Sequence, residues 1–472
     1  MKRTIILFMT TILLMIPINS FAAAITVGLK YGSSAAFSYT LTSDKGFYVG
    51  TMDGEKFEPL LPISAYTSIS LISANGIVNL YGADGNLLMQ DFGDHIIASI
   101  DYDSGGTVYV ENRPYRGGFT VSVNSSGTMN LINVLALDEY VYGVLNAEMN
   151  HSNPLEALKA QAVTARSFAT ANLDRHAQYG FDLCASTHCQ VYGGYDAEYT
   201  ETNLAADETA GLCIYSEGKP VSAYYFKNSG GYTQNAEDVW GGRLSYLKAV
   251  EDPYSPVYKW NASFTFDELK SRLDSSGNGI GTITRVEIVS RHDSGAVKML
   301  RFVGTSGSAE FSGEAVRSLL GTSVIRSTHF SFAGYQTETG SIGNTGSTLL
   351  TSMLQKISIL GIDAAAAVKE GETVSVIGES GGIVQKKTSG LFFTDGNKTG
   401  KIGESGDNSG KENGNTQLDT TVEYVTQSPV MFTGLGYGHG VGMPQDSAIE
   451  MAKQGFTFDK ILEYYYTGIQ IQ

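Results

Sequence analysis

Short runs that alternate apolar and polar positions, separated by turn dipeptides, fill the chain from residue 25 to about residue 129. Clear examples are residues 25–29, 77–81 and 107–110, with Asp-Gly and Asn-Gly pairs between such runs. Alternation with a period of two is typical of strands that bury one face, and these dipeptides are typical of turns. The pattern predicts a β-rich N-terminal region over residues 25–129.

A helical period replaces this alternation at residue 137. Five positions recur at three- and four-residue spacing and therefore share one helical face: Leu137, Val141, Val144, Leu145 and Glu148. A second helix is predicted directly afterwards, because Asn153 suits an N-cap and Pro154 suits the first helical position. Its stripe of apolar and small residues predicts close packing on a neighbour: Leu155, Leu158, Ala162, Ala165 and Ala169.

Mixed helix and strand patterns continue to about residue 335, and the composition then shifts. Residues 395–418 are rich in Gly, Asn, Asp, Ser and Lys, which is typical of a flexible linker. Apolar patterning returns at residue 430. The chain is therefore predicted to be an α+β protein, its mixed helix-and-sheet domain interrupted by a flexible insert. The predicted parts are residues 1–24, 25–129, 130–335, 336–429 (the insert) and 430–472.

The first 24 residues have the layout of a secretory signal peptide. Lys2 and Arg3 supply a positive start, residues 5–16 are largely apolar, and small residues close the segment at Ala24. The apolar run is short for a membrane span. We expect cleavage, with an uncleaved N-terminal anchor as the alternative. Both place the remaining chain outside the cytoplasm, in the extracellular space or at the cell-wall face of the membrane.

Charge and composition narrow the classes of ligand. The 472-residue chain has 32 Lys+Arg against 48 Asp+Glu, a formal net charge of -16. This acidic balance argues against nucleic acid, whose binding proteins neutralise phosphates with basic patches. The 27 tyrosines and 55 glycines suit a surface for polar, flat ligands such as sugars, and they also occur in plain β-rich folds.

Glu148 is the first candidate for chemistry. It continues an apolar stripe and lies near the C-terminal end of its predicted helix. Burial and the negative end of the helix dipole both favour the protonated carboxyl, which a general acid needs. The alternative is a solvated glutamate at a helix end.

Five motifs in a fixed order give this candidate a context. They lie at residues 145–166 (beginning LNAEM), 182–194 (with the cysteines), 228–231 (NSGG), 238–241 (DVWG) and 436–443 (GYGHGVGM). Together they resemble the stage II sporulation protein D family (SpoIID, also called SpoIID/LytB), over roughly residues 121–466. By this resemblance, residues 130–335 and 430–472 form a SpoIID-like catalytic domain.

The resemblance implies an exported peptidoglycan lytic transglycosylase. Glu148 stands where the family has its essential acid, which protonates the glycosidic oxygen and then deprotonates the C6 hydroxyl of the same sugar. Because no water attacks, a second carboxylate is not required, unlike in ordinary glycosidases. The resemblance implies no required cofactor. The implied substrate is the glycan strand, in sporulation or in cell-wall remodelling. Family members that act in sporulation are adapted to glycan already stripped of its stem peptides, and the sequence leaves the stem-peptide preference of this protein open. The implied partner is a cell-wall amidase.

Seven further residues are candidates for substrate binding: Lys159, Arg166, Ser229, Asp238, Trp240, Tyr437 and His439. The two basic residues share a helical face, which is either a saccharide-binding face or a solvated one. Ser229, Asp238 and Trp240 fit either a groove or a turn. His439 lies between glycines, where no packing reason demands histidine. At residues 444–448 the chain departs from the family pattern: it lacks the usual aromatic residue, which puts substrate affinity in question.

The three cysteines leave alternatives open. Cys184 and Cys189 suit a disulfide in an exported protein. Cys184, His188 and Cys189 also suit three ligands of a zinc ion, which some members of the family carry at this motif. A closed zinc site needs a fourth ligand that the sequence does not nominate. Inert thiols are the third interpretation.

A second function stays open beside the enzyme. The LytB branch of the family is described as a non-catalytic modifier that binds the wall and stimulates an amidase. Glu148 favours the enzyme, and the altered residues 444–448 favour the modifier.

Overall fold

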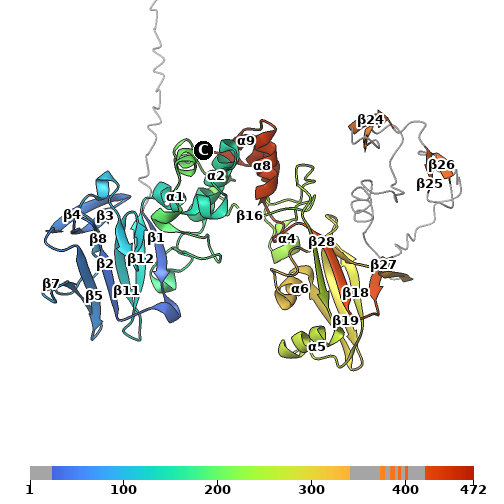
Figure 1. Ribbon diagram of the computed structural model, residues 1–472, viewed down its shortest axis with the longest axis horizontal. Helices are drawn as coiled ribbons and strands as arrows, with labels where there is room; N and C mark the ends of the chain where they lie inside the picture. Colours follow the sequence, from blue (N-terminus) through green and yellow to red (C-terminus); the bar gives the residue numbers. More distant parts are fainter. Residues whose placement is uncertain (1–23, 341–372, 378–382, 388–391, 395–398, 402–419) are drawn as a thin grey trace, which may run out of the picture. The chain divides into compact units, whose positions relative to one another are not determined.

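The protein is described by a computed structural model covering residues 24–340, 373–377, 383–387, 392–394, 399–401 and 420–472 (Figure 1). The predicted signal peptide, apart from Ala24, and most of the predicted linker lie outside the described residues. Helices and several sheets occur together, which confirms the α+β class. The chain divides into two compact units, Met1–His151 with Asn172–Gly211, and Ser152–Ala171 with Leu212–Gln472.

Two sheets build the first unit and confirm its β-rich character. The larger sheet has seven strands, in the order β13 (Leu183–Cys184), β1 (Ile25–Lys30), β12 (Met129–Leu135), β11 (Gly118–Val123), β8 (Ile96–Ser99), β3 (Phe47–Asp53) and β4 (Lys56–Ile63). The smaller has six, in the order β10 (Arg113–Tyr115), β9 (Val108–Val110), β2 (Ser38–Thr42), β5 (Ser68–Ala74), β6 (Ile77–Gly82) and β7 (Leu87–Met89). Within these two sheets, all neighbouring strands are antiparallel except β1 and β13, which are parallel.

Helix α1 (Leu137–Glu148) follows β12 directly and ends at the candidate acid. Its inward face is buried as the spacing predicts, with Val141, Val144 and Leu145 inaccessible to solvent. The 3₁₀ turn η4 (Gly194–Ala197) and helix α3 (Thr200–Asp207) contact α1 within the same unit. Gly143 is required here, because a Cβ atom would lie 2.4 Å from the ring of Tyr192.

Helix α2 (Leu155–Ala171) is the centre of a helical layer in the second unit. It contacts α8 (Gln445–Lys453) and α9 (Phe458–Tyr465). The predicted small-residue stripe is confirmed, because Ala162, Ala165 and Ala169 are fully buried. Short strands border this layer: β14 (Ile214–Ser216), β15 (Lys219–Pro220), β30 (Gln470–Ile471), β16 (Tyr225–Phe226) and β29 (Met443–Pro444).

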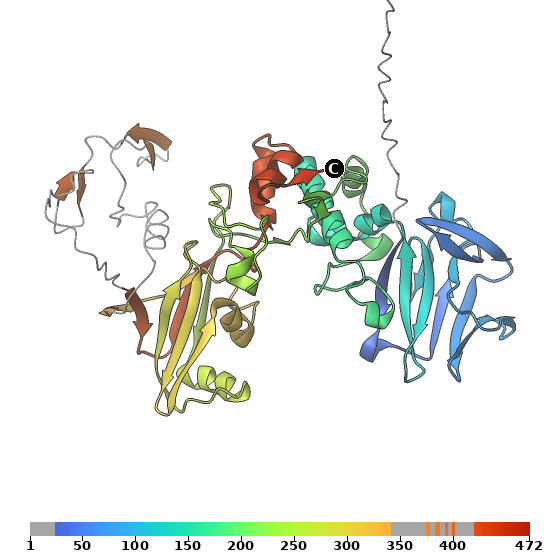
Figure 2. The same ribbon diagram turned by 180° about the vertical axis from the view of Figure 1, so that it is seen from behind.

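The second unit also holds two further sheets, seen from both sides in Figures 1 and 2. One runs β17 (Lys259–Phe264), β28 (Val430–Leu435), β21 (Phe330–Phe332), and the other runs β20 (Gly307–Ser312), β19 (Val297–Gly304), β18 (Ile283–Arg291), β27 (Thr420–Val425), β22 (Gln336–Gly340). Helices α5 (Phe266–Ser275) and α6 (Gly313–Leu320) share their apolar core, which includes Leu273, Phe302 and Phe432.

The predicted insert leaves and re-enters the fold on neighbouring strands. Strand β22 pairs antiparallel with β27, so that Gln336 lies opposite Tyr424. Between them the structure describes two short hairpins, β23 (Thr373–Ile377) with β24 (Ile383–Lys387) and β25 (Phe392–Thr394) with β26 (Thr399–Lys401). Among the described residues, no helix has both the length and the apolar character that a membrane span requires.

Candidate functional site

Glu148 is held at the C-terminal end of α1. Its side chain is partly buried, and the backbone N–H of Val191 donates a hydrogen bond of 3.1 Å to Glu148 Oε1. The preceding residue, Gln190, is buried and accepts a hydrogen bond from the hydroxyl of Tyr140 on α1. The segment after the cysteine motif therefore fixes the direction in which the Glu148 carboxyl points.

The chain just beyond Glu148 is tied back onto α1. Met149 is extended and donates its N–H to the carbonyl of Leu145. The backbone N–H of His151 donates to Asn146 Oδ1 at 2.9 Å, and the His151 ring nitrogen Nδ1 lies 3.2 Å from the same atom. These bonds give the end of the helix one conformation rather than a frayed ensemble.

Four potential metal ligands gather in the first unit. The ligand atoms of His176, Cys184, His188 and Cys189 all lie within 4.8 Å of one another. Cys189 Sγ is 3.3 Å from His176 Nε2 and 3.5 Å from His188 Nδ1, and Cys184 Sγ is 3.8 Å from His188 Nδ1. No disulfide joins Cys184 and Cys189, which are free thiols beside histidine nitrogens, so the disulfide interpretation is wrong for this structure.

His176 is the ligand that the sequence reasoning missed. It precedes the 3₁₀ turn η3 (Ala177–Tyr179) and forms a β-bridge with Phe181, which brings its ring back over the cysteine motif. The ring is buried against Phe181 at 5.0 Å and near Tyr31 at 5.7 Å. The only available signal was a histidine eight positions before Cys184, which is weak without the turn that folds it back.

The two thiols differ in acidity. Burial opposes ionisation of Cys184, but hydrogen bonds with Ser186, Cys189 and His188 together outweigh it and lower the pKa of this thiol below its ordinary value. Burial raises the pKa of Cys189. A thiolate is the form that binds a metal, so Cys184 is the cysteine more readily converted to a ligand.

In the second unit, Trp240 and His439 come together from distant parts of the sequence. Trp240 ends the short helix α4 (Ala236–Trp240), is 46% exposed, and its ring lies 5.2 Å from that of His439. Tyr224 and Phe226 complete the cluster, with ring centroids 6.3 Å and 5.4 Å from His439. The structure therefore places two of the sequence-predicted binding residues side by side.

Both ring nitrogens of His439 are engaged by the backbone. The N–H of Val441 donates to Nδ1 at 3.1 Å, so Nε2 carries the proton and donates to the carbonyl of Tyr225 at 3.1 Å. Burial and the charge of Arg317 lower the pKa of His439 to about 4. The neutral ring thus positions the glycine-rich segment, which approaches the backbone so closely that a Cβ at Gly442 would lie 2.0 Å from the carbonyl oxygen of Tyr224.

The remaining predicted residues of this unit make internal contacts. Ser229 is buried and donates to Asp252 Oδ2 at 2.6 Å, and Asp238 accepts a hydrogen bond from Asn235 and lies 3.1 Å from His292. Tyr437 pairs with Asn228 in a β-bridge. Asp252, which the sequence reasoning did not single out, also accepts hydrogen bonds from Ser447 and Tyr465 and so joins three segments.

Lys159 and Arg166 differ in their surroundings although both lie on α2. Lys159 forms an ion pair of 2.9 Å with Glu156. Arg166 is 1% exposed, and its Nη1 donates to the carbonyl of Leu212 at 3.1 Å. This geometry supports a structural role for Arg166, and contact of either side chain with a saccharide stays a prediction.

Several known proteins are similar to this chain in sequence. A family model described as "Stage II sporulation protein" (SpoIID) matches residues 125–215. The chain is 27% identical over 355 residues to the stage II sporulation protein D of Bacillus subtilis, covering 71% of this chain and 74% of that protein. The chain carries a domain of the SpoIID family. Glu148 and all four clustered ligands lie within the matched SpoIID residues.

The chain covers different shares of the length of two further relatives. The stage II sporulation protein D of Bacillus amyloliquefaciens is 33% identical over 171 residues, 32% of this chain and 49% of that protein. A Bacillus subtilis protein named "Amidase enhancer" is 28% identical over 334 residues, 69% of this chain and 39% of that protein. The SpoIID likeness therefore extends to proteins with two different functional names.

Residues 444–448, which lack the aromatic residue expected from the family resemblance, make polar contacts with the rest of the second unit. Asp446 forms an ion pair of 2.7 Å with Lys227 and accepts a hydrogen bond from Asn228. Ser447 donates to the buried Asp252 at 2.6 Å. The segment is thus integrated into the fold without the aromatic residue.

Two buried histidines predict how the second unit responds to acid. Burial, aided by the charge of Arg291 for His329 and of Arg317 for His439, lowers both pKa values to about 4. The unfolded chain therefore binds a proton at each of these histidines more tightly than the folded protein does. The contribution of the two neutral histidines to the free energy of unfolding is fully present above about pH 6.5 and is lost as pH falls toward 4. Between pH 7.5 and pH 5 we expect a loss of about 2 kcal/mol or less per histidine.

Tryptophan fluorescence during urea unfolding measures this loss selectively. The chain's two tryptophans, Trp240 and Trp260, both belong to the second unit. Replacing His329 by glutamine should reduce the difference between the two pH values. An unchanged difference would mean that other groups cause the acid sensitivity.

Proposed function

We propose that this protein is an exported lytic transglycosylase that cuts peptidoglycan glycan strands during sporulation or wall remodelling. The observation that carries the proposal is Glu148. This carboxylic acid is the last residue of α1, a helix whose inward face is buried, and it lies within the residues matched by the SpoIID family model. The backbone N–H of Val191 fixes the direction of its side chain. Export rests on the signal-like first 24 residues.

One carboxyl is sufficient for this reaction. The protonated Glu148 gives its proton to the glycosidic oxygen, and the bond from that oxygen to the anomeric carbon breaks. The resulting carboxylate then takes the proton of the C6 hydroxyl, whose oxygen bonds to the anomeric carbon and closes a 1,6-anhydro ring. The proton count balances and no water is consumed, so a second carboxylate is not needed, in contrast to hydrolytic glycosidases.

We also propose that zinc binds to His176, Cys184, His188 and Cys189. Ligand distances of 2.0–2.3 Å in a tetrahedral zinc site require separations of about 3.5 Å between ligand atoms. Three of the S···N separations, at 3.3–3.8 Å, fit that requirement, and all four ligand atoms lie within 4.8 Å of one another. A set of four protein ligands is typical of a structural site, so zinc when bound supplies a cross-link rather than a reacting water. The cross-link would hold Cys189 two residues before Val191, the donor to Glu148.

A non-catalytic, wall-binding modifier that stimulates an amidase is the second candidate. It is favoured by the relative named "Amidase enhancer", which aligns with 69% of this chain. In this alternative, Glu148 is part of a binding surface, and the glycan stays intact.

Digestion of purified glycan strands, with and without stem peptides, distinguishes the two candidates. A lytic transglycosylase should give products with 1,6-anhydro ends and no new reducing ends, as detected by mass analysis. Reducing ends would indicate a hydrolase. Intact strands, together with faster cleavage by an added cell-wall amidase, would reject the lytic transglycosylase and support the non-catalytic modifier.

A further inference from the structure

The first unit has a pocket beside the end of α1 that none of the sequence-predicted residues line. Its volume is about 520 Å³, within the range of about 300–1,000 Å³ of small-molecule sites. Its lining includes Arg116, His151, Tyr195, Glu198, Tyr199 and Asn203. We propose that this pocket is a glycan subsite that binds an uncharged, N-acetylated amino sugar.

Aromatic rings form the walls of the pocket. The ring of His151 stacks on that of Tyr199, with centroids 3.9 Å apart and planes inclined by 8°. Tyr195 and Tyr199 are 41% and 43% exposed, although both side chains are large and partly apolar. Flat aromatic faces beside polar groups suit a pyranose, which has an apolar face of C–H groups and a polar rim of hydroxyls.

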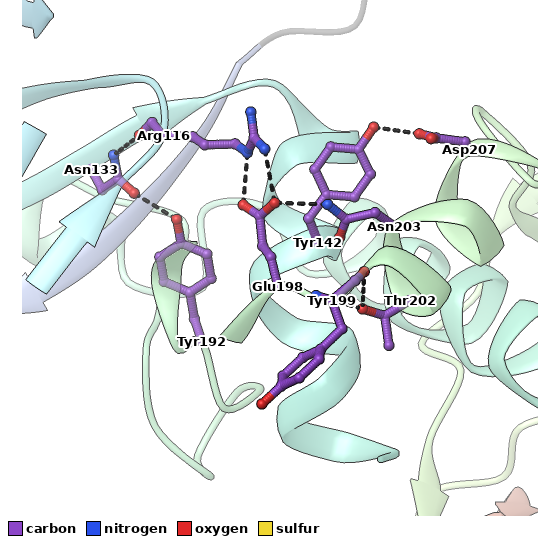
Figure 3. A network of polar contacts seen from close by, with 9 residues as sticks. All are labelled: Arg116, Asn133, Tyr142, Tyr192, Glu198, Tyr199, Thr202, Asn203 and Asp207. Atoms are coloured by element: carbon purple, nitrogen blue, oxygen red, sulfur yellow. Dashed lines mark hydrogen bonds and ion pairs between the residues drawn. The ribbon is translucent and has the colours of Figure 1, made fainter. Parts of the chain in front are cut away.

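Three other lining residues, Arg116, Glu198 and Asn203, belong to a polar network that Figure 3 shows. Arg116 donates through Nε and Nη2 to both carboxylate oxygens of Glu198, at 2.7 Å and 2.8 Å. The guanidinium also lies over the rings of Tyr142 and Tyr195, 5.6 Å and 4.9 Å from their centroids. A bidentate pair held between rings is preorganised, so little side-chain entropy remains to be lost on binding.

Asn203 supplies an unused acceptor at this network. Its Nδ2 donates to Glu198 Oε2 at 2.8 Å, which sets the orientation of the amide. Its Oδ1 is buried and accepts no hydrogen bond from any residue that the structure describes. A buried polar atom without a partner is costly, and the N–H of an acetamido group or a sugar hydroxyl would satisfy it.

The charges in the pocket favour an uncharged ring over a stem peptide. The positive charge of Arg116 is neutralised by Glu198, whose side chain is only 7% exposed. Glu201, which also lines the pocket, is exposed and adds a negative charge. Carboxylates of a peptide would therefore meet repulsion, whereas hydroxyl and acetamido groups would not.

The pocket adjoins the proposed acid. His151 follows Glu148 by three residues, so their Cα atoms are at most about 11 Å apart, and Asn146 on α1 holds the His151 ring. A sugar stacked there would be a near neighbour of the glycosidic bond that Glu148 protonates. The choice of an amino sugar rests on the proposed function, whereas its binding does not require cleavage.

Calorimetric titration of the full chain with the tetramer of N-acetylglucosamine tests the subsite. All proteins carry Glu148→Gln, so that turnover cannot obscure binding. Tyr199→Ala removes the ring but keeps the backbone N–H bond of residue 199 to Thr202, and Asn203→Ala removes the acceptor. We expect each change to weaken binding about 10-fold or more, equivalent to about 1.4 kcal/mol. Phe37→Ala is the control, because this aromatic residue of the same unit is 57% exposed and lines no described pocket.

Unchanged affinity of both variants, with unchanged thermal stability, would overturn the subsite. So would absence of binding by the parent protein, or tighter binding of a free stem peptide than of the tetramer. If the parent binds the tetramer through Tyr199 and Asn203 but glycan strands are never cut, the subsite stands and the lytic activity falls. If glycan strands are cut but the parent does not bind the tetramer, the lytic activity stands and the subsite falls.

Discussion

Replacing Glu148 by glutamine is expected to reduce glycan cleavage to the limit of detection. Glutamine keeps the shape of the side chain and its acceptor for the N–H of Val191, but it has no proton to transfer. Positioned proton transfer contributes about 10²–10⁴-fold to a rate. One group serves as acid and then as base here, so the loss should reach or exceed the upper end. Release of anhydro products from purified strands measures it.

Two further variants sharpen this test. Glu148→Asp should also fail, because shortening the arm moves the carboxyl by about 1 Å, and such misplacement can cost about 10²-fold. Glu139→Gln makes the same chemical change at another partly buried position of α1, where burial raises the pKa of the carboxyl, and it should retain activity. If neither the parent protein nor Glu148→Gln cuts glycan strands, and both stimulate an amidase equally, the enzyme hypothesis is rejected and the modifier hypothesis takes its place.

Loss of a zinc ligand is expected to unfold much of the first unit. Structural zinc sites bind with apparent free energies of about 10–16 kcal/mol in zinc-finger peptides, and whole domains are stable by only about 5–15 kcal/mol. Cys189→Ser, or removal of metal by a chelator, should therefore lower the melting temperature sharply. Metal analysis of the purified protein, together with thermal unfolding followed by circular dichroism, measures both effects.

Cys213→Ser is the matched control for the zinc prediction. Cys213 is buried in the second unit, 3.6 Å from the hydroxyl of Thr170, so its replacement should leave the metal content unchanged. If the parent protein contains no zinc after preparation without chelators, or if Cys189→Ser keeps its full metal content, the cluster is not a zinc site. Loss of glycan cleavage in the chelated protein, with Glu148 intact, would show that the metal site supports the active site.

Periodicity predicted those parts of the protein that depend on neighbouring residues. The three- and four-residue spacing located α1 and α2, and it placed Glu148 near the C-terminal end of its helix, of which it is the last residue. Alternation likewise predicted strands such as β1 and β6. These features were accessible because a helix or strand buries a face whose residues recur at a fixed local spacing.

The sequence by itself thus determined the α+β class, the two helices, the candidate acid and three of the four clustered ligands. Only the tertiary structure decided the fourth ligand, His176, the approach of Trp240 to His439 across 199 positions, and the pocket at Arg116 and Asn203. Each of these depends on turns and strand pairings that bring remote residues together. The local spacing of apolar and polar residues does not specify which remote residues come into contact.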